Sequence, residues 1–260
     1  MKKRLFKVGL GIGLLGVFSY FATKNIVNPL ATLMPSRVIY LTSDDGPLAG
    51  TVNLNRSINR LKVPITLFVV GKPPHNSQRL MKYYMMCREN RYITIGNHSF
   101  THANFHYKKY YQNPDTVIDD MKVNEKFLNI TSNMVRLPGR NVWRLKGRSW
   151  GCNRPAGVSA IKLRNMGYDV YGWDVEWHYT KDGKPKESAK KIFKIIENKF
   201  KYGRLFTPNH LVLLMHDEMF WGYEGTVEFE RFVKMIKGSP LYKFDLLENY
   251  PRGIKFAQKI

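Results

Sequence analysis

The stretch Val38-Ile39-Tyr40-Leu41-Thr42-Ser43-Asp44-Asp45-Gly46-Pro47 joins an apolar run to two adjacent carboxylates. A short apolar run that ends at a turn is typical of a buried strand, and Gly46 and Pro47 force a turn here. The two carboxylates are therefore held at the end of a strand. Three more polar segments follow or end apolar runs: His98-Ser99-Phe100-Thr101-His102, Arg136-Leu137-Pro138-Gly139 and Leu213-Leu214-Met215-His216-Asp217.

Strand-like and helix-like segments alternate along the rest of the chain. We expect strands over residues 38–41, 65–70, 92–95, 134–137, 169–173, 211–215 and 244–247. The ranges between them predict helices over residues 51–61, 77–90, 114–130, 155–166, 187–200 and 224–236. Nearly continuous apolar strands that alternate with helices favour a parallel sheet covered by helices. We therefore expect one α/β barrel over residues 36–260, with the polar segments meeting at one rim.

The N-terminus indicates export. Four basic residues precede an apolar stretch over residues 8–22: Lys2, Lys3, Arg4 and Lys7. This order is typical of a secretory signal or an uncleaved anchor. We expect residues 1–35 to form a hydrophobic helix that anchors an exported protein in the inner or cell membrane, facing the periplasm or the cell exterior. Secretion after cleavage of the signal is the alternative.

The charge and the cysteines add two further expectations. A formal net charge of +22 favours anionic partners such as acidic glycans or anionic lipid. Nucleic acid is not expected, because basic–aromatic modules and metal fingers are absent from the sequence. Cys87 and Cys152 could form one disulfide or remain free thiols.

The second polar segment predicts a metal site. His98 and His102 are four residues apart, so a helical turn or a tight loop can direct both imidazoles at one point. Imidazole suits zinc, and cobalt or another transition metal is also possible. A carboxylate would complete an open three-ligand site, and Asp45 is the natural third ligand because it also ends a strand.

The remaining polar residues supply the groups that hydrolysis needs. Asp44 can accept a proton from metal-activated water, and Arg136 can hold that carboxylate ionised through its planar fork. Gly139 would let a substrate oxygen approach a backbone N–H. His216 can protonate a leaving amine if a carboxylate holds its tautomer, and Asp174 and Glu176 are its candidate partners.

Taken together, these segments resemble the NodB-homology polysaccharide deacetylases, carbohydrate esterase family four. The resemblance runs from about residue 37 to the C-terminus. It implies a distorted (β/α) barrel with about seven parallel strands that removes N-acetyl, or occasionally O-acetyl, groups from a glycan. It also implies that Asp44 is the base, that Arg136 orients the base, and that His216 is the acid. The implied metal ligands are Asp45, His98 and His102.

The sequence departs from the family pattern at three places. Ser43 stands where Phe is usual, and Gly139 stands where an aromatic residue is usual. In the fourth motif Glu176, rather than Asp, precedes Trp177, and the spacing around Asp174 is shortened. Trp177 and Leu213 are still expected to line the acetyl pocket.

We therefore expect a metal-dependent deacetylase that acts on an acetylated amino-sugar glycan of the cell envelope, anionic or close to the membrane. Peptidoglycan, a lipid-linked amino sugar, an exported polymer and chitin-like oligomers all remain open. Hydrolysis of an O-acetyl ester or of a non-sugar amide is an alternative reaction. A membrane-anchored cationic glycan-binding protein with a vestigial site is an alternative class, since all five Trp residues could stack on sugars.

Overall fold

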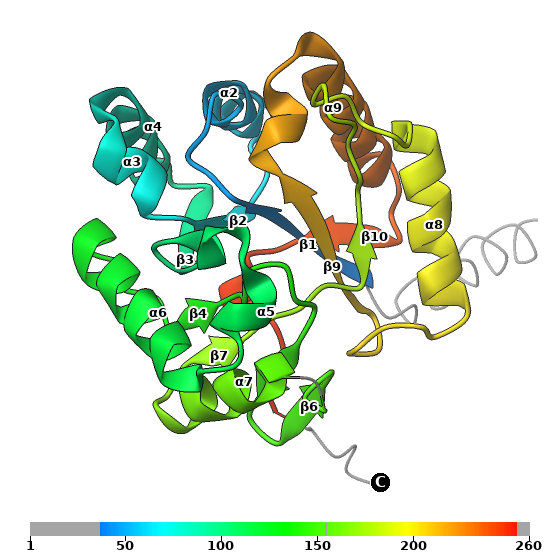
Figure 1. Cartoon of the computed structure of the whole chain (residues 1–260). Coiled ribbons are helices and arrows are strands. Elements are labelled where there is room, and N and C mark those ends of the chain that lie inside the picture. The colour runs from blue at the N-terminus through cyan, green and yellow to red at the C-terminus, as the bar shows by residue number, and fades with distance from the viewer. Residues whose placement is uncertain (1–36, 154, 254–260) are drawn as a thin grey trace, which may run out of the picture. The chain divides into compact units, whose positions relative to one another are not determined.

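Strand β1 (Arg37–Asp44), which carries the paired carboxylates, lies inside a ten-stranded sheet (Figure 1). The computed structural model describes residues 37–153 and 155–253, so the predicted anchor over residues 1–35 lies outside the described residues. Seven of the eight residues of β1 are buried. A strand covered on both faces needs such a continuous apolar run, as the sequence predicts.

The sheet is mixed and curls into half of a barrel. Its strand order is β6-β5-β7-β4-β3-β2-β1-β9-β8, and β10 pairs with the first half of β1. The strands other than β1 are β2 (Ile65–Val69), β3 (Ile93–Asn97), β4 (Met134–Val135), β5 (Trp143–Leu145), β6 (Arg148–Trp150), β7 (Asp169–Val170), β8 (Val175–Glu176), β9 (His210–His216) and β10 (Tyr242–Phe244).

Most of the helices lie around the outside of the curled sheet, whereas α5 lies in front of its centre in Figure 1. The helices are α2 (Thr51–Leu61), α3 (Lys72–Asn76), α4 (Gln78–Arg88), α5 (Tyr107–Tyr110), α6 (Pro114–Leu128), α7 (Pro155–Asn165), α8 (Ala189–Lys201) and α9 (Tyr223–Lys237). Short 3₁₀ turns occur at η1 (His102–Phe105), η2 (Asp217–Phe220) and η3 (Leu247–Asn249). Among residues 37–153 and 155–253, no helix is both long enough and apolar enough to cross a bilayer.

Two features differ from the expected parallel barrel. The hairpin of β5 and β6 is antiparallel and was not predicted, because its strands are short and rich in charge. The strand expected over residues 169–173 is split, since β7 pairs with β4 while β8 pairs with β9 at the other end of the sheet. Cys87 and Cys152 are both free thiols, so they do not form the disulfide that the sequence left open.

Candidate metal-dependent active site

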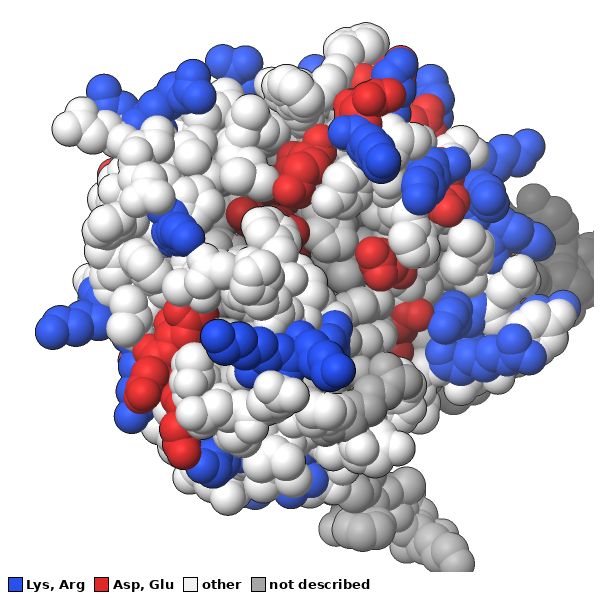
Figure 2. Space-filling model, viewed as in Figure 1, with Lys and Arg blue, Asp and Glu red and all other residues white. Residues whose placement is uncertain are grey.

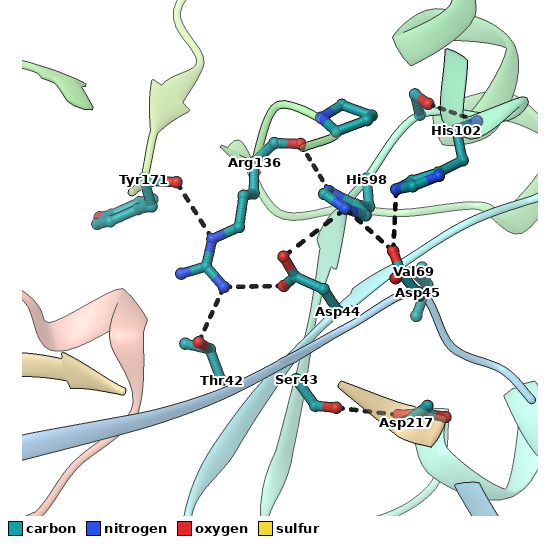
Figure 3. A network of polar contacts seen from close by, with 12 residues as sticks. Thr42, Ser43, Asp44, Asp45, Val69, His98, His102, Arg136, Tyr171 and Asp217 are labelled. Carbon is teal, nitrogen blue, oxygen red and sulfur yellow. Dashed lines mark hydrogen bonds and ion pairs between the residues drawn. The ribbon is translucent and has the colours of Figure 1, made fainter. Parts of the chain in front are cut away.

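The end of β1 presents both of its carboxylates to one point. Side chains alternate along a strand, but Asp45 adopts a left-handed backbone conformation with φ of 72°. Aspartate tolerates this conformation better than most residues. As a result the carboxylates of Asp44 and Asp45 both lie near His98, at 3.6 Å and 3.3 Å from its Nε2 (Figure 3).

A buried carboxyl group beneath the turn fixes this geometry. Asp217 accepts hydrogen bonds from the hydroxyl groups of Ser43, at 3.0 Å, and Thr51. A Cβ atom at Gly46 would lie only 2.5 Å from Asp217 Oδ2, so the close approach requires glycine. Burial raises the pKa of Asp217 to about 6, although the hydrogen bonds from Thr51 and Ser43 oppose the rise. Ser43, which departs from the family pattern, thus has a structural partner in Asp217.

The two predicted histidines lie beside Asp45, as the sequence led us to expect. Oδ1 of Asp45 is 3.3 Å from His98 Nε2 and 3.0 Å from His102 Nε2. One ligand atom from each of the three residues lies within 4.8 Å of the others. His98 Nδ1 is 2.8 Å from the backbone oxygen of Arg136, which leaves Nε2 free to bind a metal.

This donor set fits a divalent transition metal. Two imidazole nitrogens and one carboxylate oxygen form an open site of the kind that catalytic zinc uses. Burial opposes ionisation of Asp45, but the adjacent His102 and His98 rings outweigh it and lower the pKa of this carboxyl. Asp45 is therefore held as the anion that a cation requires.

Arg136 is fully buried and holds Asp44. Its Nη1 donates to Asp44 Oδ1 at 2.8 Å and to Thr42 Oγ1 at 2.8 Å. Nε donates to the backbone oxygen of Tyr171 (Figure 3), and Nη2 donates to that of Gly172. Burial lowers the pKa of Arg136, and the adjacent Asp44 carboxylate opposes this change. The predicted orientation of Asp44 by Arg136 is thus present in the structure.

His216 lies next to Asp44 in the sheet. The two residues are register partners across the parallel β1–β9 pair. Their side chains therefore lie at the same end of the two strands and on the same face of the sheet. The His216 ring packs near Tyr179, with centroids 5.3 Å apart. Its Nδ1 is buried and has no hydrogen-bond partner among the described residues.

The carboxylates predicted to support His216 are used elsewhere. Both oxygens of Asp174 accept backbone N–H groups, those of Phe206 and Val212, each at 2.8 Å. Burial raises the pKa of Asp174 to about 6 despite these bonds. Glu176 Oε2 lies 3.9 Å from His178 Nε2 and makes no described contact with His216. The split between β7 and β8 explains the difference, because it turns Asp174 toward β9.

The predicted substrate residues have different positions. Gly139 is exposed with φ of 61°, in the left-handed region that favours glycine. Trp177 and Leu213 are both fully buried, and the Trp177 indole donates to the Glu187 backbone oxygen. These two side chains belong to the hydrophobic core, and their role as pocket walls stays a prediction.

Three site residues were missed by the sequence reasoning. The Tyr107 ring lies against Gly139, where an added Cβ would be 3.0 Å from it, and its hydroxyl is 3.5 Å from His102 Nδ1. Tyr179 packs beside His216. Burial, aided by the charge of Asp45, raises the pKa of Glu218 to about 7. Only Glu218 carried a signal, because it directly follows the His216-Asp217 pair.

Comparisons with known proteins agree with this geometry. Residues 32–143 match the family model described as polysaccharide deacetylase. Over these residues the chain is similar to the polysaccharide deacetylase family. It is 24% identical to a chitin disaccharide deacetylase of Vibrio alginolyticus, over 54% of this chain and 47% of that relative. It is 27% identical to a peptidoglycan-N-acetylglucosamine deacetylase of Bacillus cereus, over 70% of this chain and 60% of the relative. The chain thus spans about half to three fifths of the length of these relatives.

Solved structures of family members share the fold. A CE4 esterase of Streptococcus mutans superposes with a TM-score of 0.61 and 17% identity, covering 84% of this chain and 89% of that structure. The catalytic domain of a peptidoglycan N-acetylglucosamine deacetylase from Eubacterium rectale gives a TM-score of 0.57 at 20% identity, covering 82% and 89%. The resemblance inferred from the motifs is confirmed. The expected α/β fold is also present, as a mixed sheet that curls into half of a barrel.

Proposed function

We propose that this polysaccharide deacetylase is a metal-dependent enzyme that hydrolyses the N-acetyl group of an amino sugar in a cell-envelope glycan. The observation that carries the proposal is the Asp45–His98–His102 cluster beside an Asp44 carboxylate that Arg136 holds. A base, an acid and a metal site at one edge of the sheet are the groups that amide hydrolysis needs.

The chain's own residues have distinct parts in this reaction. A cation held by Asp45, His98 and His102 would supply positive charge that polarises water and the acyl oxygen; we propose zinc, with cobalt or another transition metal as alternatives. Asp44 takes a proton from the attacking water, and the Gly139 N–H donates to the acyl oxygen as charge develops. His216 protonates the nitrogen as the C–N bond breaks, which releases acetate and a free amine.

Removal of the carboxylate ligand tests the metal site. We expect Asp45→Asn to abolish metal binding and to lower acetate release by more than about a hundredfold, because even residues behind a ligand contribute about 10- to 100-fold. Bound metal is measured by elemental analysis and acetate by an enzyme-coupled assay. Asp119→Asn, on the exposed face of α6, is the matched control and should keep both values. Full activity in metal-free protein would contradict the mechanism.

The identity of the products separates the proposed reaction from its rivals. An N-deacetylase leaves a free amine on the sugar, whereas an O-acetyl esterase leaves a hydroxyl group, and mass spectrometry of the product distinguishes them. A vestigial glycan-binding protein would bind the same glycan without metal and release no acetate.

The substrate and the location are further parts of the proposal. The positive net charge and the basic, apolar N-terminus support an exported protein that residues 1–35 anchor at the membrane. Screening acetate release from peptidoglycan, a lipid-linked amino sugar, an exported polymer and chitin oligomers would identify the glycan. Recovery of the full chain in the soluble fraction of cells would contradict anchoring.

A further inference from the structure

A cavity lies close to the active site, and the two share Trp173, which lines the cavity and contacts Arg136. Its volume is about 310 Å³, close to the lower limit of about 300 Å³ for small-molecule sites. Trp173, one of its walls, has its ring centroid 5.8 Å from the Arg136 guanidinium. Side chains from β5, β6, the β7–β8 link and the end of α8 surround the cavity, chiefly Trp143, Trp150, Trp173, Phe206, Lys199 and Arg204.

The aromatic walls are held rigidly. Trp143 stacks on Phe206 with centroids 4.3 Å apart and an interplanar angle of 13°. Asn141 exchanges hydrogen bonds with both the backbone N–H and the backbone oxygen of Trp173. Arg148 donates to the Phe206 backbone oxygen and to Thr207 Oγ1. The walls of this cavity are therefore fixed before any ligand arrives, which lowers the cost of binding.

Trp150 forms one wall of the cavity, and packing in the hydrophobic core does not account for its position. Its side chain is 51% exposed on β6, although tryptophan is usually well buried. Trp143, in contrast, is 2% exposed and belongs to the hydrophobic core. An exposed indole beside a fixed aromatic floor offers the flat apolar faces against which the C–H face of a sugar ring can pack.

The cations of the cavity are available to a ligand. Among the residues that the structure describes, neither Lys199 nor Arg204 forms an ion pair. The cavity also contains Asp174, but the backbone N–H groups of Phe206 and Val212 already occupy both of its oxygens. Asp174 keeps a charge on which Lys199 acts, but two cations against one carboxyl still leave the cavity with an excess of positive charge that suits an anion.

We propose that this cavity is a second binding site, which takes a sugar unit that carries an anionic group, with its ring against Trp150 and its charge on Lys199 and Arg204. Acidic side chains gather around the central hollow of the face shown in Figure 2, and Lys and Arg lie around them. The role in holding one unit of the glycan substrate rests on the proposed function. The binding of the sugar itself does not require the metal.

Binding of defined sugars to the full protein tests the site. The probes are glucosamine 6-phosphate, glucuronic acid and neutral N-acetylglucosamine, and the readouts are calorimetry and NMR. We expect at least one anionic probe to bind at least about tenfold more tightly than the neutral one, since hydrogen bonds to charged groups are stronger than those between neutral groups. The two anionic probes distinguish a phosphate-bearing unit from a carboxylate-bearing one.

Variants localise the binding. The double variant Lys199→Gln with Arg204→Gln should weaken binding of the anionic probe by at least about tenfold. Trp150→Ala should weaken it by about threefold to tenfold. The matched control is Lys191→Gln, an exposed lysine of the same helix outside the cavity, which should leave the dissociation constant unchanged. Equal binding of all three probes, or equal losses in the variant and the control, would overturn the proposal.

Chelation separates this inference from the proposed function. We expect the anionic probe to bind Asp45→Asn and chelator-treated protein as tightly as the untreated protein. Binding of the anionic probe by a protein that releases no acetate from any of the acetylated glycans in the screen would refute the deacetylase proposal and leave this site intact. Loss of binding on chelation would instead refute a separate second site.

Discussion

Arg136 shows how one residue joins stability to chemistry. Its guanidinium is fully buried, and it links Asp44 and Thr42 of β1 to the backbone of the β7–β8 link. The Phe68 ring lies 4.3 Å from the guanidinium carbon, which adds a cation–π contact. Removal of the cation would leave the buried Asp44 without its guanidinium partner, which is costly in a medium of low dielectric constant.

We therefore expect Arg136→Met to lower the free energy of unfolding by about 3–5 kcal/mol and to reduce acetate release. Urea denaturation followed by circular dichroism measures the first effect. Arg136→Lys keeps the charge but loses the planar fork. Its free energy of unfolding should therefore lie between those of the wild type and Arg136→Met. Arg79→Met, on the exposed face of α4, should change stability by less than about 0.5 kcal/mol. Equal stability of Arg136→Met and Arg79→Met would contradict this account.

The predicted site residues that the structure brings together share one property. Asp44, Asp45, His98, Arg136 and His216 follow or end strands whose apolar runs are visible in the sequence, so the parallel sheet alone brings them together. The positions of the other predicted residues depend on side-chain direction. Whether Trp177 and Leu213 face the core or a pocket follows from strand pairing, which no local pattern records.

At the scale of elements, the β7–β8 link decides how the barrel is arranged. The sequence predicts one strand over residues 169–173, because it cannot show that the chain leaves β4 and crosses to β9. Gly172 permits the crossing: an added Cβ would lie 2.2 Å from Asn141 Oδ1 and 2.5 Å from Trp143 Nε1. The sequence could therefore predict the elements, but not the sheet edge to which each belongs.

A methyl group in this link should disturb both the sheet and the site. We expect Gly172→Ala to destabilise the protein by about 1–3 kcal/mol, as overpacking of a core does. Acetate release should also fall, because the Gly172 oxygen accepts a hydrogen bond from Arg136. Thermal unfolding and the acetate assay measure these effects.

Gly222→Ala is the matched control for this substitution, since an added Cβ there meets nothing within 4 Å. Its stability should change by less than about 0.5 kcal/mol. An equally small change in Gly172→Ala would show that close packing of the β7–β8 link does not contribute to stability.

For the whole molecule, buried carboxyl groups set the response to pH. Burial raises the pKa of Asp174 and Asp217 to about 6 and that of Glu218 to about 7. The folded state therefore holds protons that the unfolded state has already released above about pH 4. This contribution to stability is complete below the unfolded pKa values, and it is lost as pH rises from about 4 to about 7.

Asp217→Asn removes one of these titrations while it keeps the shape of the side chain. We expect the variant to lose about 2 kcal/mol less stability than the wild type between pH 4.5 and 7.5. Urea unfolding at both pH values measures this difference, with chelator present so that metal binding does not contribute. Parallel losses in the two proteins would contradict the assignment to Asp217.

The pairing of β1 with β9 has a consequence for how the protein acquires activity. Asp44 faces His216 only in the observed register, which the Thr42 hydroxyl supports by donating to the Leu213 oxygen at 2.8 Å. A shift of β9 by one residue would place Met215 or Asp217 beside Asp44 and turn His216 to the opposite face. Compact misfolded chains with normal helix content would then be inactive. The recovery of acetate release during refolding thus reports the time at which these two distant strands find their alignment.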